Sequence, residues 1–232
     1  MRRILSILYL VFITVIVAGC NDQDAGKVEL DTENFFFDYL ITAEEGGEIV
    51  TCKFQYRQKG PEGEAVRLHD SGRVELDGVV LVPDSSRLNG VYYETMKPLA
   101  DFNGEHTLVF TSPGGKQYTE KFVFMPFSLE NELPQQIRRE ELTIKLANFP
   151  LERTALRLIM TDTAFNSRWI NRRIPVVNAE VVITKEILSR LKTGPIGLEL
   201  HREERKKFQQ PSAAGGRFII NYSVKRELEL VD

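Results

Sequence analysis

The sequence predicts an all-β fold, with two antiparallel β-sandwich domains and one short helix in the second. Short runs rich in β-branched and aromatic residues recur along the chain, and turns rich in Gly, Pro or Asp separate them at intervals of about ten residues. Several runs alternate apolar and polar residues, as half-buried strands do. The 232-residue chain, 42% hydrophobic, is long enough to bury a sizeable core.

The first domain is expected over residues 34–127, where turn sequences predict three hairpins. Glu44–Glu48 contains two adjacent glycines, Asp77-Gly78 suits a type I′ turn, and Ser112–Lys116 contains Pro-Gly-Gly. These turns therefore set the limits of most of the predicted strands. The strands are Phe35–Ala43, Ile49–Tyr56, Arg73–Leu76, Val79–Val82, Gly90–Thr95, Glu105–Thr111 and Gln117–Phe124.

A linker is expected over residues 128–140, where Pro134 and mixed charges interrupt the alternation, and the second domain over 141–232. Lys185–Leu191 is predicted as a helix, because Thr184 can cap its N-terminus and its apolar residues have helical spacing. The strands expected in this domain are 142–146, 156–160, Ile174–Ile183, Gly194–Leu200 and Gly216–Leu230.

The first twenty residues carry a targeting signal. Arg2 and Arg3 precede the apolar run Ile4–Val17, which is shorter than the roughly 20 residues of a transmembrane helix. The ending Val17-Ala18-Gly19-Cys20 resembles the signal of bacterial lipoproteins. That resemblance implies a signal peptide over 1–19, lipid on Cys20 and a polar tether over 20–33. An uncleaved N-terminal anchor and an ordinary signal peptide are the alternatives.

The body of the chain also resembles a known class. Val74–Gly78 and Phe102–Phe110, followed by a Phe-rich hairpin, resemble the immunoglobulin-like sandwich domains of bacterial envelope proteins. The whole chain is similar to lipoproteins of the Gram-negative cell envelope, of the Bacteroidetes type. The resemblance implies a lipid anchor in the cell envelope. Because Asn21 rather than Asp follows Cys20, it further implies the outer membrane, with the body facing the periplasm or the cell surface.

Charge and motif content exclude several functions. Without Arg2 and Arg3 the chain has 28 basic and 33 acidic residues, and nucleic-acid binding requires clustered positive charge. The three histidines lack metal-ligand spacing, and no nucleophile elbow or phosphate-binding loop is present, so we expect no enzyme, no metal and no cofactor. Cys52 alternates in sequence with Val50 and Phe54, so in a strand the three side chains point to the same face; this shared parity predicts a buried, unreactive thiol.

One segment, residues 162–173, has the composition of a ligand-facing loop. It contains the only tryptophan of the chain together with a phenylalanine, asparagines and arginines. The candidate ligand-binding residues are Phe165, Arg168, Trp169, Arg172 and Arg173. The alternative is that Trp169 and Phe165 fold back to close the end of the sandwich, with the arginines solvated.

These observations favour a membrane-anchored envelope lipoprotein with a non-catalytic binding or structural role, whose partner is an envelope protein or a glycan. A more specific hypothesis is a carbohydrate- or peptide-binding module that uses the 162–173 loop. Two further hypotheses are an enzyme whose site lies at the domain interface and a structural subunit of an envelope assembly.

Overall fold

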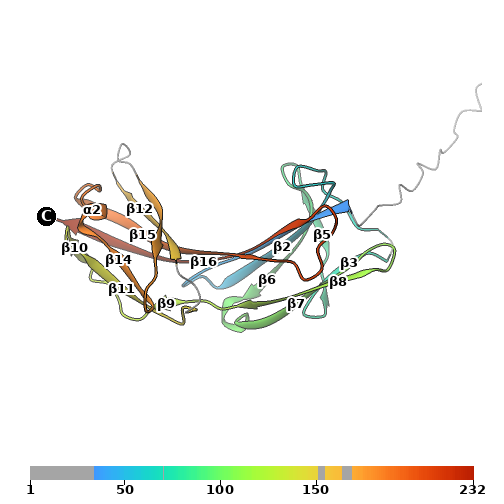
Figure 1. Ribbon diagram of the computed structural model, residues 1–232, viewed down its shortest axis with the longest axis horizontal. Helices are drawn as coiled ribbons and strands as arrows, with labels where there is room; N and C mark the ends of the chain where they lie inside the picture. Colours follow the sequence, from blue (N-terminus) through green and yellow to red (C-terminus); the bar gives the residue numbers. More distant parts are fainter. Residues whose placement is uncertain (1–33, 70, 151–154, 164–168) are drawn as a thin grey trace, which may run out of the picture. The chain divides into compact units, whose positions relative to one another are not determined.

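Strands dominate the structure, a computed structural model that describes residues 34–69, 71–150, 155–163 and 169–232 (Figure 1). Among these residues, the largest sheet has the strand order β13-β12-β15-β16-β1-β2-β6-β5, and β10 pairs with β16 beside this path. Its strands are β1 (Phe35–Glu44), β2 (Ile49–Gln58), β5 (Pro83–Ser86), β6 (Gly90–Pro98), β10 (Gln136–Arg138), β12 (Ala155–Asp162), β13 (Ile170–Pro175), β15 (Gly194–Lys206) and β16 (Gly216–Val231).

Two smaller sheets complete the described part of the chain. One has the order β4-β3-β7-β8 and the other the order β14-β11-β9. Their strands are β3 (Arg73–Leu76), β4 (Val79–Val80), β7 (Gly104–Thr111), β8 (Gln117–Phe124), β9 (Ser128–Leu129), β11 (Leu142–Ala147) and β14 (Glu180–Ile183). The helical segments are η2 (Leu99–Asp101) and α2 (Lys185–Leu188). No helix in the described ranges is long and apolar enough to cross a membrane.

The four-stranded sheet packs face to face on the part of the large sheet that contains β1 and β2. Phe37 of β1 meets Phe110 of β7 and Tyr118 of β8 edge-on, with ring centroids 5.6 and 5.3 Å apart. On β2, Cys52 and Phe54 are fully buried, as their parity predicted. Aromatic side chains therefore fill the space between two sheets, which confirms the predicted sandwich.

A second buried layer lies between the three-stranded sheet and the strands β12, β15 and β16. Phe127 meets Phe149 and, on β16, Tyr222, each at 5.4 Å between ring centroids. Val181 of β14 and Leu158 of β12 are fully buried. The short helix α2 begins after Thr184, whose side chain accepts a hydrogen bond from the Ile187 backbone N–H, as predicted. The all-β class with one short helix is thus confirmed.

Two strand pairings are parallel, whereas the sequence predicted antiparallel sheets. β16 pairs in parallel with β1 over Gly216–Ser223 and with β10 over Glu229–Val231. The first of these pairings joins strands from opposite sides of residues 128–140, and that stretch contains β9 and β10. The domain boundaries at 34–127 and 141–232 stay a prediction.

The predicted strand Ile174–Ile183 is wrong, because the structure divides it into β13 and β14. Between them Asn178 and Ala179 both have positive φ, at 52° and 60°, and Val177 pairs with Glu180 across the turn. Two successive positive φ values are typical of a type I′ turn, which normally has glycine at its second central position. Alanine stands there instead, so the sequence lacked the usual signal. The turn takes the chain from the large sheet to the three-stranded one.

Candidate functional site

The predicted ligand-binding residues do not all lie in one loop, because part of the segment 162–173 forms a strand. Phe165 and Arg168 lie outside the described residues. Trp169 directly precedes β13, and Arg172 and Arg173 lie within that strand, at the edge of the large sheet. Residues 170–173 are therefore an edge strand, which fixes the direction of each side chain.

Strand alternation divides these residues between the two faces of the sheet. Ile170 and Ile174 are buried, at 2% and 3% exposure, so Arg172, which has the same parity, is directed to the inner side at the sheet edge. Arg173 has the opposite parity and projects from the outer face, whereas Trp169 directly precedes the strand. Trp169 is 64% exposed, so its indole ring does not fold back to close the sandwich.

The outer face of β13, β12 and β15 carries a row of nitrogen-containing side chains. Arg173 of β13 lies directly opposite Arg157 of β12, and Arg157 lies opposite His201 of β15. Both arginines are exposed. Arg157 and His201 could not be recognised as site residues from the sequence, because only the strand register brings them beside Arg173.

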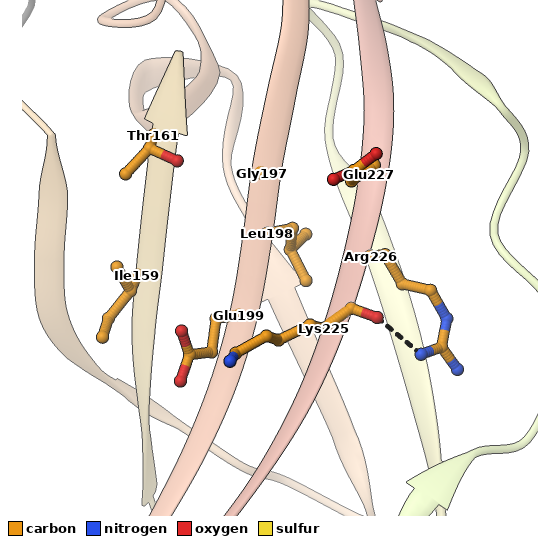
Figure 2. Close-up of a pocket in the computed structure, with 8 residues that line it drawn as sticks. All are labelled: Ile159, Thr161, Gly197, Leu198, Glu199, Lys225, Arg226 and Glu227. Carbon is orange, nitrogen blue, oxygen red and sulfur yellow. Dashed lines mark hydrogen bonds between the residues drawn. The ribbon is translucent and has the colours of Figure 1, made fainter. Parts of the chain in front are cut away.

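A shallow depression of about 260 Å³ lies beside this row on the same face (Figure 2). Its floor is at Gly197, which pairs with Thr161 on one side and Glu227 on the other. A Cβ atom at Gly197 would approach the Thr161 hydroxyl to 2.9 Å. The absent side chain therefore creates the depression, and Ile159 and Glu199 lie along it.

Several charged groups at the depression have ionic neighbours. Lys225 Nζ donates a hydrogen bond to Glu44, and this bond is the largest cause of the raised pKa of Lys225, with a further contribution from Glu199. His201 Nδ1 lies 3.5 Å from Glu199 Oε1. Figure 2 shows the Lys225 side chain lying across the sheet toward Glu199. Glu199 thus lies beside Lys225 and His201, whereas Glu227 makes no ion pair within the described ranges.

A second histidine, the buried His106, pairs with the exposed Asp77, and both of its ring nitrogens are engaged. Nδ1 lies 2.8 Å from Asp77 Oδ2, and Nε2 lies 3.0 Å from the Phe102 carbonyl oxygen. The ring also stacks on Phe102 at 3.7 Å between centroids. Asp77 Oδ1 accepts a hydrogen bond from the Thr107 backbone N–H. The pair therefore holds the Asp77-Gly78 turn against β7.

Cys52 lies in the buried layer, as predicted. It is 0% exposed, and burial raises the pKa of its thiol to about 12. The thiolate required for nucleophilic chemistry is therefore disfavoured at neutral pH. The segment His201–Arg205 lies in β15, which extends beyond the predicted end at Leu200. No group of three or more His, Cys, Asp or Glu side chains within the described residues is arranged to hold a metal ion.

Comparisons with solved structures give distant likenesses to this chain. No family model and no curated protein matches the chain. A structure bearing on host cell surface retention of a 1.5-MDa bacterial ice-binding adhesin is similar at 14% identity and a TM-score of 0.25. It covers 84% of this chain, which spans 63% of the length of that chain.

A structure of DIP-gamma IG1+IG2 is similar at 9% identity and a TM-score of 0.24, covering 82% of this chain and 96% of that one. A complex of Dpr11 IG1 with DIP-gamma gives 12% identity, a TM-score of 0.23 and coverage of 82% and 97%. TM-scores this low do not establish a shared fold. The fold described above therefore rests on its own strand pairings and buried layers.

Proposed function

We propose that the chain is a lipid-anchored protein of the bacterial cell envelope whose β-sandwich body has a non-catalytic binding role. One observation supports the binding role above all: the outer face of β13 and β12 presents two exposed, directly opposed arginines beside a shallow depression, and an exposed indole ring directly precedes β13. Exposed aromatic and arginine side chains on one surface are typical of binding sites. The partner is an envelope protein or a glycan.

Anchoring is proposed from the N-terminal sequence. Val17-Ala18-Gly19-Cys20 follows a short apolar run, and acyl chains on Cys20 would hold the body at the membrane without a transmembrane helix. Two or more chains give durable anchoring where one does not. The outer membrane is the proposed site, because Asn21 follows Cys20.

Replacing Cys20 by serine is expected to abolish anchoring. In cells fed an alkyne-labelled fatty acid, the wild-type chain should take up the label and sediment with membranes, whereas Cys20→Ser should do neither. Cys52→Ala is the matched control, because Cys52 is buried and should leave labelling unchanged. Undiminished labelling of Cys20→Ser would overturn the proposed anchor.

The binding role is tested by a photoreactive amino acid placed at position 171. Asn171 is exposed and lies on the outer face between Trp169 and Arg173, whereas Lys121 is exposed on β8 of the four-stranded sheet. On irradiation of intact envelopes, position 171 should give a discrete crosslinked species and position 121 should not. Equal crosslinking from both positions, or none from 171, would contradict a binding role for this face.

A further inference from the structure

We infer that the outer face of β13 and β12 binds an acidic polysaccharide, with Arg157 and Arg173 holding a sugar carboxylate and Trp169 stacking on a neighbouring ring. This inference rests on the proposed binding role of the same face and adds the chemical class of the ligand. Three features support it: the opposed arginines, the pairing of the nearby acids, and the position of the indole.

The opposed arginines form a cross-strand pair of like charge. Residues directly opposite on antiparallel strands have Cβ atoms about 5 Å apart, and like charges at that separation destabilise a sheet. Arg157 and Arg173 are both exposed, and within the described ranges neither makes an ion pair. A carboxylate bound between them would relieve the repulsion, because each planar guanidinium can donate two parallel hydrogen bonds to it.

Two acidic side chains close to these arginines, Glu199 and Glu203, have other cationic or imidazole neighbours. Glu203 accepts a hydrogen bond from Arg205 Nε at 2.9 Å, and this bond is the main cause of its lowered pKa, to which Arg157 adds a smaller contribution. Glu199 lies near His201 and Lys225. Among the described residues, Arg157 and Arg173 make no ion pair of their own, so both remain available to an external anion.

Trp169 places an aromatic surface at a suitable spacing from the arginines. Asn171 and Arg173 alternate along β13 and project from the outer face, and the exposed Trp169 directly precedes that strand, roughly 13 Å from Arg173 along the backbone. A short run of sugar rings spans such a distance. Indole faces stack on sugars, and the Asn171 amide between them can hydrogen-bond to ring hydroxyls.

A polysaccharide fits this arrangement better than an acidic peptide. A peptide that adds to a sheet pairs with the backbone of an edge strand and directs its side chains into pockets. The groups described here instead project from the face of the sheet. An acidic peptide is therefore an outcome that the experiment must separate from an acidic glycan.

Fluorescence titration of the full chain in detergent tests the inference, because Trp169 is the only tryptophan of the chain. The probes are polygalacturonate oligomers and their methyl esters, which keep the sugar rings but remove the carboxylate charge. Polygalacturonate should change the emission saturably, and the esters should bind at least about tenfold more weakly. Arg157→Gln and Arg173→Gln should each weaken binding by about tenfold. Lys121→Gln, an exposed cation on β8, should leave binding unchanged.

Thermal unfolding without ligand separates a binding role from a structural one. If the arginines serve a ligand, Arg157→Gln should raise Tm by roughly 1–2 °C, because it removes the like-charge repulsion. A lowered Tm together with weakened binding would instead indicate a structural role and would overturn the inference.

Three other results would also overturn the glycan assignment. These are equal binding of the esters, tighter binding of poly-glutamate than of polygalacturonate, and no binding of polygalacturonate at all. In each case a crosslinked species from position 171 would show that the proposed binding role itself holds. If position 171 also gave no crosslinked species, both the glycan assignment and the proposed binding role would fail.

Discussion

Replacing Phe37 by alanine should lower the free energy of unfolding by about 3–5 kcal/mol, the largest effect expected of a single side chain in this protein. Phe37 is 1% exposed, and its ring contacts Tyr56, Phe110, Tyr118 and Phe208 at 5.3–5.7 Å between centroids. These rings come from its own sheet, the facing sheet and the segment between β15 and β16. No single neighbour can move to fill the cavity, so the cost should lie at the upper end of the range.

Urea denaturation followed by far-UV circular dichroism measures this loss. Leu40→Ala is the matched control on the same strand, because Leu40 is 36% exposed and its truncation should cost less than about 1 kcal/mol. Phe37→Leu should fall between the two. A loss for Phe37→Ala no larger than that for Leu40→Ala would show that the aromatic cluster does not support the sandwich.

The alternation of apolar and polar residues and the turn-forming dipeptides correctly predicted those strands and turns that depend on neighbouring residues. On β2 the parity of Val50, Cys52 and Phe54 predicted a buried face, and all three are 0% exposed. Asp77 and Gly78 both have positive φ, as expected of their dipeptide. Such features depend on residues within a few positions of one another, which a single sequence displays directly.

Features that depend on which strands pair could not be predicted in the same way. Nothing in the alternation of β16 indicates that Gly216–Ser223 pairs in parallel with β1, because periodicity determines a face and not a partner. The turn at Asn178-Ala179 was missed for a local reason, the absence of glycine.

The candidate site was found only in part. Composition drew attention to Trp169 and Arg173, since both lie in the segment that holds the only tryptophan. Arg157 and His201 lie 16 or more residues away from Arg173 and join it only through the register of β13, β12 and β15. The sequence of each strand separately shows only an exposed polar residue.

Replacing Gly216 by alanine should cost about 3 kcal/mol, because its Cβ atom would collide with a neighbouring strand. The added atom would lie 2.7 Å from the Phe37 carbonyl oxygen and 2.6 Å from Cε2 of the Phe208 ring. The ring can rotate away, but the carbonyl belongs to β1, which β2 and β16 hold on both sides. Relief therefore requires a backbone shift in β1 at the residue whose ring organises the aromatic cluster.

Gly114→Ala is the control for this substitution. Gly114 has only the Ser112 hydroxyl oxygen near its ideal Cβ position, at 3.8 Å, so alanine there should change stability by less than about 0.5 kcal/mol. Urea midpoints of the two variants give the comparison directly. Equal urea midpoints for the two variants would mean that β1 and β16 can move apart without loss of stability at Phe37 and Gly216, where their pairing begins. A large loss confined to Gly216→Ala would instead show that this parallel pairing, which local sequence does not indicate, is closely packed where it begins.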